Sequence, residues 1–426
     1  MGTAAHRAAA HRRFSLLNAY SGSIASIIRT HHQKGETSMN FELTARQKKI
    51  YDTVGSLARE KFAARAAKAD VEAKTPVENL RDLHKAGLLG MTISEDLGGM
   101  GSGCAGKDPL LYLLAVEQTA RTCMSTAQCL HIHLHGAHYV DKVGTQKQRE
   151  RILGEVIGKG ALLNATGSEP GRTSRGLYNL ITIADRVDGG YKISGLKNYA
   201  TLGDVVDYNV IFAGIRDKTG SEGHLGVAVP KDAPGLKVVE GSWNPIGMRG
   251  AASPTLRLED CFVPDDLVLG PPGIYPTERW QARFHLSFAA QYLGGAEGIF
   301  DILADYLPKR GTAGDSYAQL RMGEIRVGIE SVRWLIYRAA WMWTRSDRVQ
   351  AELFSMVAKH RALENAVVVM DKAAQIAGSS AFWADSPLSR FYRDMRIHTL
   401  HENLDKTAAT LGKYHLGQEF DTTARL

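Results

Sequence analysis

The hydrophobic positions along the chain change their period twice. Between residues 39 and 155 apolar side chains recur at helical spacing, as in "DPLLYLLAVEQTAR" at residues 108–121. Near Gly160 short β-rich runs take over, among them "LITIADRV", "YNVIFAGI" and "TLRLEDCFV", and Gly, Asp or Pro separates them. From Thr277 the helical period returns and continues through four long segments. This pattern predicts a block of helices, a block of strands and a second block of helices.

The order of these blocks predicts an α+β fold with three domains. We expect an N-terminal helical domain at residues 39–155, a central antiparallel β-barrel or sandwich at 156–271 and a C-terminal four-helix bundle at 272–426. About seven short strands within about a hundred residues favour a compact antiparallel domain over alternating βαβ units. Four long helical segments with short connections are typical of a bundle.

Residues 1–38 are an N-terminal extension that differs from the rest in composition. The segment is rich in Ala, Arg, His and Ser and carries five Lys or Arg against one acid. This composition is typical of a mitochondrial transit peptide, which would direct the protein to the matrix. The alternative is an upstream extension of the start site, because Met39 opens "MNFELTARQKKIYDTVG", which resembles a natural beginning. We favour this second hypothesis slightly, and with it a cytoplasmic location and a disordered extension.

Composition and charge exclude several classes of protein. The chain is 44% hydrophobic and 23% charged, as expected of a globular protein. Of its net charge of +7, residues 1–38 contribute +4, so the remaining residues are nearly neutral and show no nucleic-acid footprint. No apolar run approaches the roughly 20 residues that span a bilayer. The four cysteines have no CxxC spacing, which favours reduced thiols in a reducing compartment.

Two motifs that suggest chemistry favour a structural interpretation. "GGMGSG" at residues 98–103 is glycine-rich, but no strand precedes it, so the dinucleotide fingerprint fails. "HIHLHGAH" contains four histidines without an acid between them, which does not match a helical metal motif. We therefore expect no metal and a packed or cleft-lining helix, with His133 as a candidate for substrate contact.

The segment "LLNATGSEPGRTSRG" at residues 162–176 ends an apolar run abruptly. Its Gly and Pro are typical of a turn between strands. The hydroxyls of Ser168 and Ser174, beside an acid and two arginines, also suit a loop that holds a ligand. Three further segments are weak signals when taken separately: "GLKNYATLGDVVDY", "IGMRGAASPTLRLEDCFVP" and "SRFYRDMRIHTLHENLDK".

Together and in this order, the segments resemble the acyl-CoA dehydrogenase superfamily of flavoproteins. The similarity extends over about residues 41–417. "GMRGAASPTLRLEDCFVP" is close to the family signature, "GSEPGRTS" looks like its flavin loop, and "QIAGSSA" matches a motif of its bundle. The resemblance implies a helical domain, a β-barrel and a four-helix bundle, with FAD, or alternatively FMN, as cofactor.

The resemblance also implies a cofactor site. The residues that would line the flavin are Ala165, Thr166, Gly167 and Ser168 in one loop and Tyr199, Ala200 and Thr201 in another. The residues that would reach the FAD phosphates of a neighbouring subunit are Arg310, Gln375 and Gly378. The family's assembly implies a homotetramer.

Glu402 falls where the best-known family members keep their catalytic base. There a carboxylate removes the α-proton of an acyl-CoA thioester while the β-hydrogen leaves as hydride to the flavin. The electrons then pass to an electron-transfer flavoprotein. The alternative for Glu402 is an exposed glutamate on a helix.

A related branch offers a second hypothesis. The family base is normally followed by Gly-Thr, whereas Asn403 and Leu404 follow Glu402. "LHENLDK" resembles a run found in flavin-dependent monooxygenases similar to dibenzothiophene monooxygenase. In that branch His401 would support the flavin hydroperoxide, and a partner reductase would supply reduced flavin. We place the dehydrogenase slightly ahead because the acid is retained, and a flavin-free binding protein is a remote alternative.

Substrate contacts follow from the resemblance less clearly. Ser174 matches a serine near the acyl-CoA. The arginine that dehydrogenases keep at the start of the first bundle helix aligns best with His285, and Arg283 lies nearby, so Arg283 is a candidate for substrate binding. Arg172 has no assigned role, because the closest family pattern has a small residue there.

Overall fold

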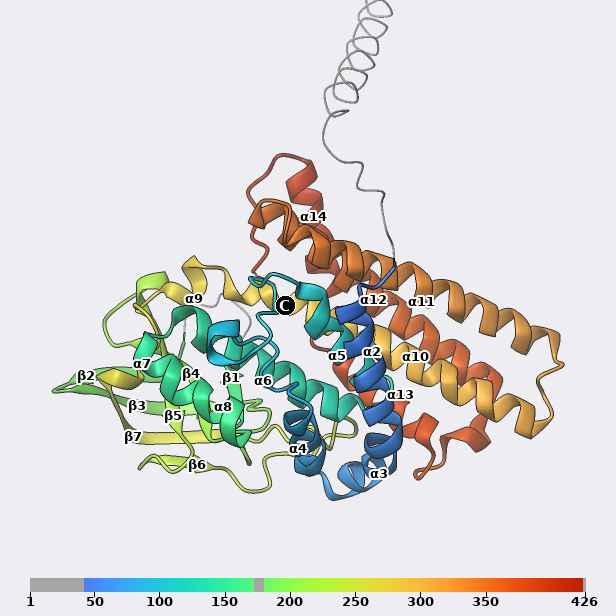
Figure 1. The fold of residues 1–426 in the computed structure, drawn as a ribbon, viewed down its shortest axis with the longest axis horizontal. Helices are drawn as coiled ribbons and strands as arrows, with labels where there is room; N and C mark the ends of the chain where they lie inside the picture. The colour runs from blue at the N-terminus through green and yellow to red at the C-terminus, as the bar shows by residue number, and fades with distance from the viewer. Residues whose placement is uncertain (1–41, 172–179, 424–426) are drawn as a thin grey trace, which may run out of the picture. The chain divides into compact units, whose positions relative to one another are not determined.

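A computed structural model describes residues 42–171 and 180–423 (Figure 1). Residues 45–426 belong to one compact unit, whose described part follows the predicted order of helices, strands and helices. In Figure 1 the sheet lies on the left and the long helices of the bundle on the right. The predicted fold class is confirmed.

The N-terminal helices include a central pair that is buried almost all round. Helix α5 begins where Asp108 accepts a hydrogen bond from the Leu110 N–H at 3.1 Å, and α6 carries the four predicted histidines in its buried middle. Helix α6 packs against strand β1 and also contacts α5 and α10, so it joins the sheet to the bundle. The helices are α2 (Ala45–Leu57), α3 (Ala63–Glu72), α4 (Val77–Lys85), α5 (Pro109–Ala120), α6 (Met124–Val143), α7 (Gln146–Gln148) and α8 (Gly154–Lys159).

The strands between residues 163 and 264 form one curled sheet. Its order is β1-β4-β2-β3-β7-β6, and β5 also pairs with β4. A bridge between Val227 in β5 and Val268, just after β7, shows how far the sheet curls. The strands are β1 (Leu163–Thr166), β2 (Ile183–Val187), β3 (Gly190–Lys197), β4 (Tyr208–Ile215), β5 (His224–Pro230), β6 (Leu236–Val238) and β7 (Leu256–Pro264).

The β-domain differs from the predicted antiparallel barrel in one respect. Strand β4 pairs in parallel with β1 and with β2, whereas the other pairings are antiparallel. Parallel neighbours need a long connection, and here the chain from β1 to β4 passes through β2 and β3. The hydrophobic period of the sequence can predict single strands, but it does not show which strands pair across long connections.

The C-terminal helices form the bundle, but the fourth predicted helix is divided. It ends at Thr399 and a new helix begins at Leu404, because the Asn403 side chain accepts a hydrogen bond from the Lys406 N–H at 3.0 Å. His401 and Glu402 therefore lie in a turn between two helices. The helices are α9 (Ile274–Thr277), α10 (His285–Arg310), α11 (Ser316–Met342), α12 (Arg348–Ala377), α13 (Pro387–Thr399) and α14 (Leu404–His415).

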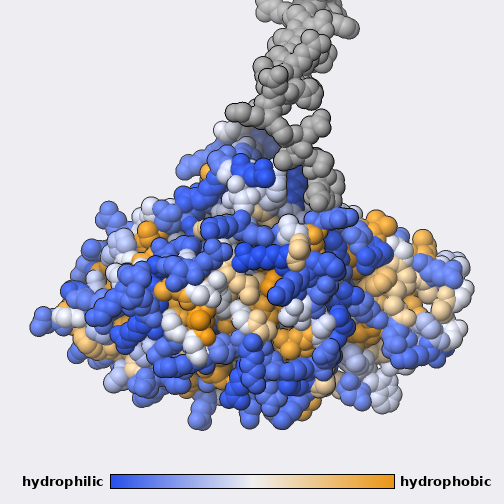
Figure 2. Space-filling model, in the orientation of Figure 1, coloured by the Kyte–Doolittle hydropathy of each residue, from blue (hydrophilic) through white to orange (hydrophobic). Residues whose placement is uncertain are grey.

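One face of the molecule can be inspected for apolar patches in Figure 2. Hydrophilic residues predominate on the face in Figure 2, and hydrophobic ones form small scattered patches. None of the helices within 42–171 and 180–423 combines the length and apolar character that a bilayer span requires.

A buried group of charges joins α5 to the bundle. Arg333 in α11 donates to Glu117 in α5 at 2.6 Å and also to Glu297 in α10. The Tyr337 hydroxyl donates to the second oxygen of Glu117 at 3.3 Å. Burial, opposed by the attraction of Arg333 and aided by the Glu297 charge, raises the pKa of Glu117 to about 7. Arg333 is therefore the cation that allows two carboxylates to lie side by side in the core.

Replacement of Arg333 by methionine should destabilise the protein strongly. The change leaves Glu117 and Glu297 buried without their cation, which costs about 3–5 kcal/mol in the free energy of unfolding. Urea unfolding followed by circular dichroism measures this loss. The control is Arg326→Met on the same helix, where an exposed pair with Glu330 is lost and the cost should stay below about 1 kcal/mol. Equal losses in the two variants would contradict a special role for Arg333.

Candidate functional site

A cavity of about 530 Å³ lies between the sheet, helix α6 and the bundle. Its walls come from segments far apart in the sequence. They are the loop after β1, the loop after β3, residues 243–253, the start of α10, the middle of α12, the α13–α14 turn and the C-terminal segment.

The end of β1 and the loop after it supply one wall. Ala165, Gly167 and Ser168 line the cavity, and Thr166 is buried beside them. The Thr166 hydroxyl has no hydrogen-bond partner among the described residues. The methyl side chain of Ala165 and the lack of a side chain at Gly167 leave room for a flat group against this wall.

An ion pair anchors this loop. The Glu169 carboxylate accepts from Lys197 Nζ at 2.8 Å and from the N–H groups of Ile181 and Thr182, each at 2.9 Å. Both charged side chains are fully buried. Burial alone would raise the pKa of Glu169, but Lys197 and the main-chain donors hold it below its usual range. The pair thus fixes the loop after β1 to the end of β3.

The loop after β3 supplies the adjoining wall. Tyr199 and Thr201 line the cavity, and the Thr201 hydroxyl bonds Ser253 at 2.9 Å. Ala200 is fully buried behind them, and its N–H donates to the Pro254 carbonyl at 3.0 Å. The structure therefore brings the predicted residues of the two loops to one place.

The α13–α14 turn supplies ionisable side chains to the cavity. Glu402 and His401 both line the cavity. Glu402 is not the exposed helix glutamate that was one alternative, because its side chain is only 2% exposed. It forms an ion pair with Lys359 of α12, and the Thr407 hydroxyl donates to its other oxygen. The cavity thus contains a shielded carboxylate beside an ammonium group.

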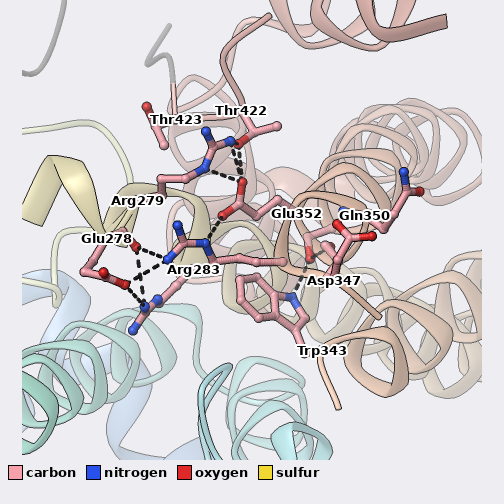
Figure 3. A network of polar contacts seen from close by, with 12 residues as sticks. Glu278, Arg279, Arg283, Trp343, Asp347, Gln350, Glu352, Thr422 and Thr423 are labelled. Atoms are coloured by element: carbon pink, nitrogen blue, oxygen red, sulfur yellow. Dashed lines mark hydrogen bonds and ion pairs between the residues drawn. The ribbon is translucent and has the colours of Figure 1, made fainter. Parts of the chain in front are cut away.

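The C-terminal segment closes this end of the cavity. Thr423 lines it, and the Thr422 carbonyl lies 3.0 Å from His285 Nε2. Thr422 is held in turn by its hydroxyl, which bonds Arg279 and Glu352 in the network of Figure 3. Arg279 also donates to Glu352 at 2.6 Å. Thr422 is therefore tied to α12 next to the cavity.

Two predicted residues lie away from the cavity. Arg283 stacks on the Trp280 ring at 3.7 Å and belongs to the charged network of Figure 3, through Glu278. His133 is fully buried, with Nε2 at 3.1 Å from the Leu89 carbonyl and Nδ1 accepting from the Leu163 N–H. Within residues 42–171 and 180–423 no three His, Cys, Asp or Glu side chains gather as a metal would require.

A second predicted group gathers at the far, exposed end of the bundle. Arg310 at the end of α10 bonds the Ala377 carbonyl next to Gly378, and Gly378 has a φ of +72°. Gln375 is exposed one turn earlier on α12 and accepts from Arg321 at 2.7 Å. These residues lie together but do not line the cavity. Arg172 and Ser174 fall outside the described residues.

The site includes residues that sequence patterns did not single out. The main one is Lys359, and it had a detectable signal. It falls on the buried stripe of α12, between Ser355 and Ala362, where a charged side chain is unusual. Trp243, Gln281 and Thr423 also line the cavity, but no local motif marks them.

Known proteins are similar to this one along most of the chain. The profiles of the acyl-CoA dehydrogenase N-terminal, middle and C-terminal domains match residues 44–159, 165–261 and 282–402. The short-chain specific acyl-CoA dehydrogenase of Clostridium acetobutylicum is 30% identical over 375 residues, which is 85% of this chain and 96% of the relative.

The chain belongs to the acyl-CoA dehydrogenase family.

Other members of the acyl-CoA dehydrogenase family are similar along the same length. Acryloyl-CoA reductase of Anaerotignum propionicum is 29% identical, over 85% of this chain and 92% of that protein. The solved butyryl-CoA dehydrogenase of Megasphaera elsdenii shares the fold with a TM-score of 0.81 at 24% identity, covering 89% of this chain and all of that one. Dibenzothiophene monooxygenase from Paenibacillus has the same fold, with a TM-score of 0.77 at 22% identity, covering 88% and 99% of the two chains.

Replacement of Lys197 by methionine should destabilise this family member in a pH-dependent way. In the wild type the lowered pKa of Glu169 contributes stability above its usual titration range, and this is lost as the pH falls through the folded value. In the variant unopposed burial raises the pKa instead, so the loss of about 3–5 kcal/mol at pH 8 should shrink toward pH 5.

Urea unfolding at several pH values measures this effect. The control is Lys231→Met, which removes an exposed pair with Asp207 in the same domain and should cost below about 1 kcal/mol at every pH. A loss in Lys197→Met that does not change between pH 5 and 8 would argue against a buried, charged Glu169.

Proposed function

We propose that this protein is an FAD-dependent acyl-CoA dehydrogenase, which oxidises the Cα–Cβ bond of an acyl thioester. The observation that supports it most is the buried carboxylate of Glu402 in the same cavity as the loops after β1 and β3. The relatives named as short-chain acyl-CoA dehydrogenase and acryloyl-CoA reductase support the same substrate class.

The residues of the two loops fit a flavin. The wall has a methyl group at Ala165, no side chain at Gly167 and hydroxyls at Ser168 and Thr201, which suits a flat ring with polar edges. The aromatic side chain of Tyr199 would lie along it. FAD, when bound there, would supply the acceptor for the hydride that leaves the β-carbon. The chain's own groups must bind the thioester, exclude water and move the proton.

Glu402 is suited to move that proton. A general base must be ionised before the reaction and lie within reach of the acidic C–H group. The Glu402 side chain is shielded from solvent, and the Thr407 hydroxyl bonds one of its oxygens. The carboxylate takes the α-proton and becomes a neutral carboxyl group. We propose that an electron-transfer flavoprotein then receives the electrons.

A monooxygenase is the second candidate, because His401 lines the same cavity. Its ring lies 5.2 Å from that of His398 and 5.9 Å from that of Phe288, measured between centroids. A histidine in this place could donate to an oxygen species, and a flavin reductase would then be the partner.

The exposed face of α11 supports a homotetramer. Leu320, Val327, Trp334 and Trp341 lie seven residues apart and are all exposed, whereas the other face of the helix is buried in the bundle. An apolar seam of this period fits a second copy of the same helix. In such an assembly Arg310, Gln375 and Gly378 could reach the FAD phosphates of a neighbouring copy.

The location remains a proposal of the same kind. We propose the cytoplasm, or the mitochondrial matrix if residues 1–38 act as a transit peptide.

Anaerobic mixing of the FAD-loaded protein with a panel of acyl-CoAs tests the function. The flavin absorbance should bleach with at least one thioester, and Glu402→Gln should slow bleaching by at least about 10²-fold, because it cannot accept the proton. Glu364→Gln, an exposed glutamate of α12, is the control and should bleach normally.

The opposite outcome would favour the second candidate. In that outcome no thioester bleaches the flavin. The protein instead catalyses an oxygen-dependent hydroxylation or sulfoxidation that needs reduced flavin and is lost in His401→Ala. These two results together would contradict dehydrogenation.

The assembly can be tested by light scattering after size-exclusion chromatography. The wild type should have the mass of four chains, and the double variant Leu320→Glu, Val327→Glu should dissociate, because charges are placed in the apolar seam. Val71→Glu, at an exposed apolar residue of α3, should leave the mass unchanged. A double variant with the wild-type mass would exclude the α11 face as the contact.

A further inference from the structure

Lys359 is a buried ammonium that the proposed reaction does not yet explain. Its side chain is 7% exposed, it lines the cavity, and it comes from the middle of a long helix. A lysine in such a place loses hydration that only close partners can replace. Its partners include the carboxylate of Glu402, His285 and, at 5.4 Å, the face of the Phe288 ring.

The Thr422 carbonyl determines which ring nitrogen of His285 donates a hydrogen bond and which one accepts. His285 Nε2 lies 3.0 Å from the Thr422 carbonyl oxygen, which can only accept, so Nε2 carries the hydrogen. In a neutral ring Nδ1 is then an acceptor, and Lys359 Nζ lies 3.1 Å from it. The lysine therefore donates to His285. Burial first, and then the Lys359 charge, lower the pKa of His285 to about 3, which agrees with a neutral ring.

Lys359 is held as a donor on both sides by this arrangement. One N–H is directed at His285 and another at Glu402. Hydrogen bonds from a charged ammonium are stronger than those from a neutral amine. Since His285 is itself fixed by the Thr422 carbonyl, the position of the ammonium depends on the end of the chain. Thr422 depends in turn on Glu352 and Arg279 (Figure 3).

We propose that Lys359 is a positioning residue that keeps Glu402 ionised in the cavity, and that His285 and the Thr422 main chain hold Lys359 in place. This inference rests on the proposed function in one respect, namely that Glu402 is the base. It goes further because it names a lysine of α12 as the group that keeps this base ionised. The attraction between the two groups sets the pH below which Glu402 takes up a proton, and so the lower end of the pH range of the reaction.

The two fully buried histidines near Glu402 do not supply this charge. His131 of α6 and His398 of α13 are fully buried, and burial lowers the pKa of His131 to about 3 and that of His398 well below its usual value. Both rings are therefore neutral at pH 7. His401, in the same turn as Glu402, bonds the His398 carbonyl through Nδ1 at 2.9 Å. From α14 the uncharged Thr407 hydroxyl bonds Glu402.

An infrared titration of the ligand-free protein tests the proposal without any substrate. The band of a protonated carboxyl group that is missing in Glu402→Gln reports on Glu402 alone. Lys359→Met should move the midpoint of this band up by about 1–3 pH units, because the opposite charge is lost. Lys359→Arg keeps the charge and should restore most of the shift. Lys372→Met is the matched control, since that lysine of α12 pairs with an exposed Glu324.

A second readout links the charge to the reaction. The acid limb of the pH profile for kcat/KM should move in the same direction and by the same amount as the infrared midpoint. A purely structural role of Lys359 would lower activity at every pH and leave both midpoints in place.

The outcomes separate this proposal from the proposed function. An unchanged infrared midpoint in Lys359→Met overturns the role of the lysine. A shifted midpoint in a protein whose flavin no thioester bleaches supports the lysine and removes the dehydrogenase. If the methionine variant does not fold, Lys359→Gln takes its place. A wild-type protein in which Glu402 is already protonated at pH 7 overturns the proposal whatever the variants do.

Discussion

The buried carboxylate of Glu402 depends on groups that reach it from two other helices. Lys359 in the middle of α12 supplies the charge, the Thr407 hydroxyl of α14 bonds one oxygen, and Asn403 caps the helix that begins just beyond. An isolated carboxylate would be too costly to bury in such a cavity, since it would lose its hydration without compensation. The packing of the bundle and the position of this one group are therefore linked. If α12 were shifted or rotated, Glu402 would have to turn outward or become neutral.

Paired charges join the other walls of the site in the same way. Glu169 and Lys197 fix the loop after β1 to the end of β3, and Arg333 joins α5 to α10 and α11. In each case the partners are distant in sequence and fully or nearly buried. Such pairs contribute little net stability compared with apolar packing, but removal of one partner is costly. They therefore constrain how the helical domain, the sheet and the bundle fit together around the cavity, and the cavity depends on that fit.

Much of this was predictable from the sequence, but not all of it. Periodicity predicted the order of helices, strands and helices, and the motifs predicted the family. The resemblance to the family also pointed to Glu402 as a site residue, and Glu402 lines the cavity. The division of the last helix at Asn403 was missed, since an apolar period continues through it. Lys359 was missed because its role comes from a partner 43 residues further along the chain, which only the tertiary structure brings close.

The central claim is that Glu402 removes a proton from the α-carbon of a thioester in this cavity. Incubation of the FAD-loaded protein with an acyl-CoA in D₂O, without an electron acceptor, tests this claim most directly. Mass spectrometry of the recovered thioester should show solvent deuterium at the α-carbon, catalysed by the wild type and absent with Glu402→Gln. The role of Glu402 would be contradicted by a thioester that bleaches the flavin yet exchanges its α-proton equally fast with both proteins. The whole account would be contradicted by a bound thioester that neither exchanges its α-proton nor bleaches the flavin.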